Sequence, residues 1–401
     1  MNVTPLRIEA LPPYLFAAID EIKGDALRAG IDVIDLGVGD PDLSPPPAVI
    51  EALARSVRAD GAHHYSSYTG VPELRRAFAE WFEKRFRVSL DPDREVLPLL
   101  GSKEGIGHMF PAAVNPGDEV LIPDPGYPVY TAGAILAGAT PRYFPLRENR
   151  GFLPDIEELA NLVSPKTKML WLNYPSNPTA AMASRDDFET LAAFARDRGM
   201  LVCHDMAYSE IVFDGARSPS FLENADGMKV GVEFHSLSKT FCMPGWRVGF
   251  AAGNADAIAL LAKVKTNLDS GIFIPVQEAA IVALRDCDSD RERIRRVFES
   301  RRNRFVGRLR KAGWNVPLPP STFYLWTPVP DGHDSMEFCT FLLREAGIVC
   351  TPGVGFGPHG EGFVRMSMTV PEARLDEAVS RIEGLSITEG EGGFRAESSI
   401  R

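Results

Sequence analysis

A lysine in an unusual setting is the first candidate for chemistry in this sequence. Lys239 follows an apolar run, in the segment Ser236-Leu-Ser-Lys239-Thr-Phe-Cys-Met-Pro-Gly-Trp-Arg247. Serines stand at −3 and −1, and an arginine stands at +8. A lysine amine can form a Schiff base with a carbonyl compound, and hydroxyls with a planar guanidinium suit a phosphate dianion. A lysine at a strand end is more often simply solvated, so other residues must support this interpretation.

Two further candidates follow another apolar run, Met200-Leu-Val-Cys-His204. Asp205 is either a helix cap or a carboxylate that pairs with a pyridine nitrogen and keeps it protonated. A protonated pyridine ring takes up carbanion electrons, as in pyridoxal 5′-phosphate (PLP). Tyr208 is either a tyrosine at the edge of the core or a hydroxyl that bonds the phenolic oxygen of that ring. Together with Lys239, these residues indicate a PLP site.

Polar residues also follow two other predicted strands. Asn177 comes after Met169–Leu172, in a cluster of Asn and Pro that is typical of a turn. Ser102 and Lys103 come after Val96–Leu100 and would open a helix, as a plain cap or as a phosphate site. Ligands of open α/β sheets bind outside the carboxyl ends of the strands. We therefore expect all the candidates to lie at one edge of a sheet.

The elements that must position these residues alternate along the middle of the chain. Short apolar runs predict strands at Val96–Leu100, Glu119–Ile122, Thr140–Phe144, Met169–Leu172, Leu201–His204, Val232–Ser236 and Val248–Ala252. Amphipathic stretches between them predict helices, among them Lys103–Val114, Asp155–Leu162 and Arg185–Asp197. This alternation predicts an α/β fold with a mostly parallel, doubly wound sheet.

From Glu278 onward the pattern is that of a smaller α+β domain. We expect a long helix from about Gln277 to Lys311, an extended segment at Thr322–Trp326, a helix from Ser335 and a strand at Gly362–Met368. The predicted organisation is an N-terminal segment, residues 1–40, that packs with the small domain, a large PLP-binding domain, 41–280, and a small C-terminal domain, 281–390. A polar, Gly-rich tail, 391–401, is expected to be disordered.

Composition narrows the classes of function. The chain has 401 residues, 45% of them apolar, and a formal net charge of −11, which disfavours nucleic acid and anionic membranes as partners. The sequence contains no run of about twenty apolar residues, so it predicts no membrane span. Residues 1–10 do not resemble a secretion signal. The five cysteines are scattered without a CxxC pair, so we expect reduced thiols in a cytoplasmic protein and no metal site.

Taken jointly, the motifs resemble those of the class I/II aminotransferases, which are PLP enzymes of fold type I. The matching segments follow the family's order over about residues 30–370: YxxxxGxPELR from Tyr65, NYPSNPT, HDMAY, SLSKTFCMPGWRVG and VRMS. The resemblance implies an enzyme that moves an amino group between an amino acid and a 2-oxo acid.

The resemblance also implies a role for each matching residue. Lys239 would carry PLP as a Schiff base and shuttle a proton, and Asp205 would pair with the pyridinium. Asn177 and Tyr208 would bond the ring oxygen. Tyr127, in Asp124-Pro-Gly-Tyr127-Pro, would stack on the ring. The phosphate would be held by Ser102, Lys103, Ser236, Ser238 and Arg247.

On the substrate side, the α-carboxylate would meet Arg365, in VRMS, and the backbone amide of Gly39, with Asn177 nearby. Taken alone, an arginine such as Arg365 is more often an ordinary surface residue. Tyr65 would reach the phosphate of a partner subunit, which implies a homodimer with shared active sites. The alternative is that Tyr65 packs within its own subunit.

Four segments resemble the LL-diaminopimelate aminotransferases and their bacterial relatives: Leu11-Pro-Pro-Tyr-Leu-Phe16, Asp269-Ser-Gly-Ile-Phe273, Thr322-Phe-Tyr-Leu-Trp326 and Gly355-Phe-Gly-Pro-His-Gly-Glu-Gly362. They imply that Tyr14 contacts the substrate, with LL-diaminopimelate as donor and 2-oxoglutarate as acceptor. Relatives also take other amino acids, so an aspartate/alanine type is the alternative. Cys242 stands where many relatives carry Asn, outside the expected contacts, so we expect no loss of chemistry. Either Asn267 or Ser270 is a candidate to reach the partner's phosphate.

Two other classes of function share part of the pattern. A PLP-dependent lyase or decarboxylase would use Lys239 in the same way and break a different bond of the substrate; the Arg365 clamp favours transamination. A regulator with an aminotransferase-like domain needs a DNA-binding segment, for which we expect no room before Ala10 or after Ile387.

Overall fold

The computed structural model describes residues 4–12, 15–330 and 333–385, and for residues 15–21 it describes the backbone only. The expected contact of Tyr14 and the expected disorder of residues 391–401 lie outside the described residues. Within the described part of the chain, no helix has the length and apolar character that crossing a membrane requires.

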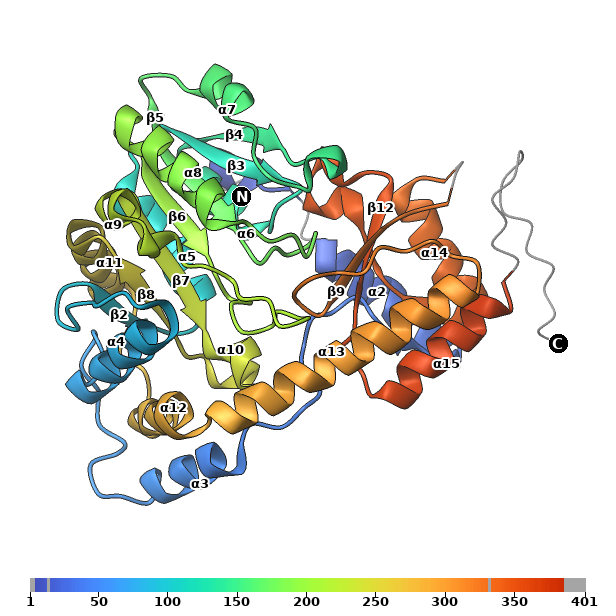
Figure 1. Ribbon diagram of the computed structural model, residues 1–401, viewed down its shortest axis with the longest axis horizontal. Helices are drawn as coiled ribbons and strands as arrows, with labels where there is room; N and C mark the ends of the chain where they lie inside the picture. Colours follow the sequence, from blue (N-terminus) through green and yellow to red (C-terminus); the bar gives the residue numbers. More distant parts are fainter. Residues whose placement is uncertain (1–3, 13–14, 331–332, 386–401) are drawn as a thin grey trace.

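A seven-stranded sheet forms the centre of the larger lobe (Figure 1), in the order β2-β8-β7-β6-β5-β3-β4. Its strands are Val96–Leu99 (β2), Glu119–Asp124 (β3), Thr140–Pro145 (β4), Thr167–Asn173 (β5), Leu201–Asp205 (β6), Gly231–Ser236 (β7) and Gly249–Gly253 (β8). β8 runs antiparallel to both of its neighbours, and the other neighbouring pairs are parallel. These strands confirm all of those predicted for the middle of the chain, and with them the α/β class.

Apolar side chains cover both faces of this sheet. Successive residues of β5 alternate between two clusters: Leu170 and Leu172 join one, and Met169 and Trp171 join the other. A strand buried on both faces reads as a continuous apolar run, which is why the sequence reveals it. The helices of this lobe are Pro47–Ser56 (α3), Pro72–Phe86 (α4), Ser102–Ala113 (α5), Val129–Leu136 (α6), Ile156–Leu162 (α7), Arg185–Arg198 (α8), Ala225–Val230 (α9), Leu237–Thr240 (α10), Ala255–Leu268 (α11) and Ile274–Asp286 (α12).

The smaller lobe contains an antiparallel sheet in the order β11-β12-β9. Its elements are Asp288–Lys311 (α13), Tyr324–Pro328 (β9), Ser335–Ala346 (α14), Ile348–Val349 (β10), Thr351–Pro352 (β11), Phe363–Ser367 (β12) and Glu372–Glu383 (α15). The N-terminal segment adds Leu6–Glu9 (α1), Leu15–Arg28 (α2) and Ile34–Asp35 (β1). β1 pairs in parallel with β10, and α2 contacts α14. The division of the chain at residues 40, 280 and 390 stays a prediction.

The prediction of one long helix from about Gln277 to Lys311 is wrong, because the structure has two helices in this segment. α12 ends at Asp286 and α13 begins at Asp288, with Cys287 between them at φ −109° and ψ 28°. α12 packs on α3 and α4 in the larger lobe, whereas α13 runs across to the smaller one (Figure 1). The segment Asp286-Cys-Asp-Ser-Asp290 is rich in Asp and Ser, which favour helix ends over helix interiors.

Candidate active site

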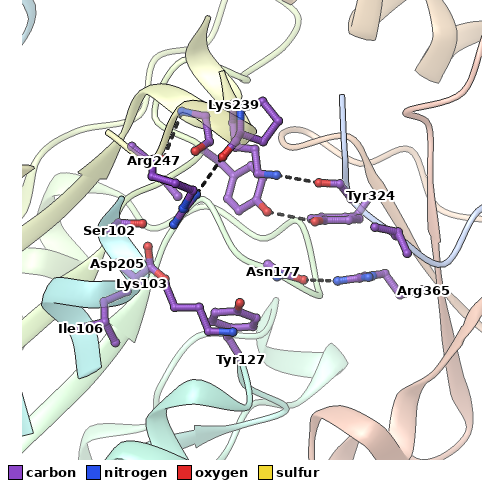
Figure 2. A pocket seen from close by; sticks show the side chains of 17 residues that line it. Ser102, Lys103, Ile106, Tyr127, Asn177, Asp205, Lys239, Arg247, Tyr324 and Arg365 are labelled. Atoms are coloured by element: carbon purple, nitrogen blue, oxygen red, sulfur yellow. Dashed lines mark hydrogen bonds between the residues drawn. The ribbon is translucent and has the colours of Figure 1, made fainter. Parts of the chain in front are cut away.

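A cavity of about 400 Å³ lies at the carboxyl ends of the parallel strands, where the smaller lobe faces the sheet (Figure 2). Asp205 ends β6 and Ser236 ends β7, while Arg365 reaches the cavity from β12. The topology therefore brings distant parts of the sequence together. The cavity wall contains twelve of the fourteen predicted site residues: Gly39, Ser102, Lys103, Tyr127, Asn177, Asp205, Tyr208, Ser236, Ser238, Lys239, Arg247 and Arg365.

The other two predicted residues are Tyr65 and Tyr14. Tyr65 precedes α4, is 91% exposed and is not among the residues that line the cavity of its own chain. Tyr14 lies outside the described residues. Cys242, where the sequence departs from the family pattern, is buried and does not line the cavity.

Lys239 lies in the short helix α10 that follows β7. Its Nζ donates a hydrogen bond of 2.6 Å to the carbonyl oxygen of Gly39. Burial lowers the pKa of Lys239 to about 8; Asp40 opposes this shift and Arg365 adds to it. At neutral pH, Lys239 therefore has a larger neutral fraction than an ordinary lysine, as a nucleophilic amine requires.

The carboxylate of Asp205 has one oxygen engaged and one without a partner. Oδ2 accepts a hydrogen bond of 2.9 Å from the hydroxyl of Tyr130, on α6. Oδ1 is buried and has no hydrogen-bond partner among the described residues. Burial raises the pKa of this carboxyl group, and the bond from Tyr130 opposes the shift. A buried acceptor at a cavity wall fits an N–H donor from a bound ring, which would hold the carboxylate in its charged form.

Groups that suit a phosphate gather at the start of α5. Ser102 is the first residue of that helix, where free N–H groups and the helix dipole favour an anion. Arg247 lies beside it and donates to the carbonyl oxygen of Pro244 at 2.9 Å. Gly101 leaves room for this guanidinium, because a Cβ there would lie 2.2 Å from Arg247 Nη2. Lys103, Ser236 and Ser238 complete this part of the wall.

Arg365 presents a guanidinium that the surrounding residues fix in place. The side chain is 1% exposed. It donates to Asn177 Oδ1 at 2.7 Å and to the carbonyl oxygen of Gly37 at 2.6 Å. The rings of Tyr324 and Phe356 flank it, with centroids 4.2 Å and 4.9 Å from Cζ. A planar cation held in this way fits a carboxylate, which can accept two parallel bonds from it.

The sequence analysis missed several residues of the site, and two of them are tyrosines whose hydroxyls bond predicted site residues. Tyr324, on β9, lines the cavity, and its hydroxyl lies 2.9 Å from the hydroxyl of Tyr208. Tyr130 lies behind the wall and bonds Asp205. Each stands among apolar neighbours and has the pattern of a core aromatic. The sequence carries no local signal that distinguishes them, apart from the likeness of Thr322-Phe-Tyr-Leu-Trp326 to a subfamily motif.

The fold and the site together define an α/β enzyme. Its cavity places a lysine amine between a group of residues that suit a phosphate and a buried arginine. The chain belongs to the family described as aminotransferase class I and II, whose sequence model matches residues 31–382. It is 50% identical over 378 residues to the LL-diaminopimelate aminotransferase of Desulforudis audaxviator (strain MP104C), covering 94% of this chain and 96% of that protein. It is 48% identical over 381 residues to that of Aquifex aeolicus (strain VF5), covering 95% and 98%. Substrate-bound BacF from Bacillus subtilis has a similar structure, with a TM-score of 0.94, 35% identity and coverage of 98% and 100%.

The protein is therefore a PLP-dependent aminotransferase, with an amino acid and a 2-oxo acid as its substrates. This confirms the predicted family, fold type, cofactor and class of reaction. The cavity fits PLP on three observations: the amine of Lys239, the buried oxygen of Asp205 that has no partner within the described part of the chain, and the space at Gly101 that admits Arg247.

Proposed function

We propose that this aminotransferase takes the amino group of LL-diaminopimelate and passes it to 2-oxoglutarate. The observation that carries the proposal is the full-length similarity to relatives named for LL-diaminopimelate, at 48–50% identity. The geometry agrees with an α-amino acid as donor, because the amine of Lys239 and the guanidinium of Arg365 line one cavity.

We assign the cofactor contacts by position and geometry. When bound, PLP supplies a ring that takes up the electron pair left by a proton departing from the substrate Cα. Nζ of Lys239 holds the cofactor and then carries that proton. Oδ1 of Asp205 keeps the ring nitrogen protonated, and Tyr127 covers the ring face. Asn177 and Tyr208 bond the ring oxygen. The phosphate is held by Ser102, Lys103, Ser236, Ser238 and Arg247.

The substrate carboxylate is bound by Arg365 and by the backbone amide of Gly39. Arg365 is already oriented by Asn177 and by the carbonyl oxygen of Gly37, so little side-chain entropy is lost when the substrate binds. The fixed guanidinium orients the substrate so that its amine and Cα face Lys239. Orientation of this kind lowers the barrier to proton transfer.

We also propose a homodimer in which each site uses residues of both subunits. Tyr65, Tyr68, Leu268 and Phe273 are large, exposed side chains on two segments that lie together. The rings of His63 and Phe273 are 5.9 Å apart, and Gln277 Nε2 donates to Ser66 Oγ at 2.7 Å. This surface supports a partner that buries Tyr65. Asn267 or Ser270, in the second segment, is a candidate to reach the partner's phosphate.

We place the protein in the cytoplasm. All five cysteines are free thiols and all are buried, which agrees with a reducing compartment.

A panel of amino donors tests the substrate assignment. LL-diaminopimelate, aspartate and alanine are each paired with 2-oxoglutarate and with pyruvate, and kcat/KM is measured through oxo acid formation. We expect LL-diaminopimelate with 2-oxoglutarate to exceed every other pair by at least about tenfold. Preference for aspartate or alanine would establish the alternative type. Loss of the donor without transfer of its amino group would indicate a lyase.

A further inference from the structure

Tyr324, which is labelled beside Arg365 in Figure 2, contacts three groups of the site at once. Its hydroxyl lies 2.9 Å from that of Tyr208. Its ring backs the guanidinium of Arg365, with 4.2 Å between Cζ and the ring centroid. Its hydroxyl oxygen also fills the space beside Gly39, because a Cβ built there would lie 1.8 Å from it. The ring is buried, with 3% of the residue exposed, so its position is fixed by these neighbours.

The bond between the two tyrosines has a direction that follows from the proposed role of Tyr208. A phenolic hydroxyl has one proton to donate. If Tyr208 donates that proton to the ring oxygen of PLP, it must accept the proton of Tyr324. Burial raises the pKa of the Tyr208 hydroxyl, so this group stays protonated and available as a donor. Among the described residues, Tyr208 is the hydrogen-bond partner of the Tyr324 hydroxyl.

We propose that Tyr324 is a positioning residue with two separable actions. Its hydroxyl donates to Tyr208 and thereby strengthens the bond that Tyr208 donates to the ring oxygen, since hydrogen bonds in a chain polarise one another. Its ring holds Arg365 in the orientation that receives the substrate carboxylate. The inference rests on the proposed roles of Tyr208 and Arg365.

A pH titration of the absorption of the bound cofactor tests the first action in the holoenzyme. Donation to the ring oxygen stabilises its anionic form and lowers the pKa of the chromophore. Tyr324→Phe should therefore raise that pKa by about 0.5–1 pH unit, and Tyr208→Phe should raise it further. The double variant should match Tyr208→Phe alone, because Tyr324 acts through Tyr208.

Tyr143→Phe is the matched control. Tyr143 lies outside the cavity wall, and its hydroxyl is 3.3 Å from that of Thr131, so this variant also loses a contact between two hydroxyls. The pKa of its chromophore should equal that of the wild type. Tyr324→Leu is a second variant without the hydroxyl and should show the same shift as Tyr324→Phe.

Substrate kinetics test the second action. Tyr324→Phe keeps the ring, so the KM for the amino donor should stay within about twofold of the wild-type value. Tyr324→Leu removes the ring, and its KM should rise by about tenfold, the range expected for a buried cation–π contact. An unchanged KM in Tyr324→Leu would overturn the second action.

The titration separates this inference from the function it rests on. A wild-type chromophore pKa in Tyr324→Phe, together with a raised pKa in Tyr208→Phe, would overturn the inference alone. Full addition of the two shifts in the double variant would also overturn it, because the residues would then act independently. An unchanged pKa in Tyr208→Phe would overturn both the inference and the proposed role of Tyr208.

Discussion

At the scale of single residues, burial changes the ordinary behaviour of the groups on which the site depends. Lys239 has a pKa of about 8 because it is buried. Among the described residues, one oxygen of the buried Asp205 has no hydrogen-bond partner, and Arg365 is held by two acceptors and two aromatic rings. These environments agree with the proposed roles, in which the cofactor or the substrate supplies the partner of each group.

The variant Asp205→Ala should bind PLP but transaminate much more slowly than the wild type. Without the carboxylate, the ring nitrogen loses its proton and the carbanion loses its electron acceptor. One electrostatic contact of this kind is worth about 3–4 kcal/mol, or about 10²–10³ in rate. Single-turnover rates with PLP-saturated protein measure the effect, and Asp205→Asn, which keeps the shape and loses the charge, should be slow as well. A near-normal rate in Asp205→Ala would remove this residue from the mechanism.

Arg365→Lys should weaken substrate binding much more than PLP binding. Lysine keeps the charge but loses the two parallel donors, and a misaligned substrate should also lower kcat. We expect KM for the amino donor to rise by at least about tenfold, the cost of one charge-assisted bond. Arg142→Lys, at an exposed position of β4, is the control and should change neither constant. Equal losses of cofactor and substrate affinity would contradict the assignment.

The sequence was sufficient to identify the site residues that stand in an unusual sequence context. It was insufficient to identify the residues that support them. Lys239 and Arg247 stand out because two serines precede the lysine and the arginine follows it eight residues later, a combination that suits a phosphate group. Tyr324 and Tyr130 do not stand out, because their hydroxyls find partners only after the chain has folded. Those partners, Tyr208 and Asp205, lie 116 and 75 residues away.

At the scale of elements, the neighbouring strands β6 and β7 are joined by a buried carboxylate. Glu233, on β7, accepts hydrogen bonds from His204 Nδ1 at 2.9 Å, His235 Nε2 at 3.1 Å, Ser220 Oγ at 2.8 Å and the backbone N–H of Phe221 at 2.7 Å. Burial alone would raise the pKa of Glu233, but the bonds from the two histidines lower it to about 2. Asp205 ends β6 and Ser236 ends β7, so this cluster supports the edge that carries the site.

Glu233→Gln should lower the melting temperature at pH 7 by roughly 3–4 °C, because the variant breaks a buried charged network worth about 3 kcal/mol and the unfolding entropy of a chain of this length is about 0.8 kcal/mol/K. The pKa of Glu233 is lower in the folded protein than the ordinary value of 4.5. Its contribution to stability is therefore present above that value and is lost as the pH falls toward 2.

The difference in melting temperature between wild type and Glu233→Gln should accordingly shrink when calorimetry is repeated at pH values below about 4.5. Glu148→Gln, at an exposed position, is the control and should melt with the wild type at pH 7. Equal melting temperatures of wild type and Glu233→Gln at pH 7 would rule out a supporting role for the cluster.

The helices and strands could be predicted from the sequence wherever burial imposes a regular pattern of apolar residues. Strands buried on both faces gave continuous apolar runs, and their ends were placed within a few residues. The boundary between α12 and α13 was missed because one residue, Cys287, separates two helical patterns. The interruption reflects the lobes that each helix packs against, which a local pattern does not reveal.

At the scale of the whole molecule, both lobes contribute residues to the cavity wall, and the proposed dimer would bury the exposed Tyr65 against a partner subunit. Its hydroxyl would donate a charge-assisted bond to the partner's phosphate, worth roughly 1.5–3 kcal/mol. Tyr65→Phe should therefore bind PLP about ten- to a hundredfold more weakly while the chain stays folded. Equilibrium binding of PLP to the apoenzyme measures this change.

Subunit mixing decides whether the sites are shared. Tyr65→Ala and Lys239→Ala are each expected to be inactive at limiting PLP. A mixed dimer of the two would have one site with both defects and one site with neither, so activity should reappear as subunits exchange. A mixture that stays inactive despite demonstrated exchange, or an active monomer in sedimentation, would contradict the shared site.

The most direct test of the account is a half-reaction without acceptor. LL-diaminopimelate is mixed with PLP-loaded protein, and the conversion of the cofactor to its amine form is followed by absorption and by mass spectrometry. We predict one amino group transferred per chain, full recovery of the original spectrum when 2-oxoglutarate is added, and no conversion in Lys239→Ala. Borohydride reduction before mixing should block the reaction and place the cofactor on the peptide that contains Lys239. An unchanged cofactor spectrum in the wild type, or a reduced adduct on any other lysine, would contradict the account.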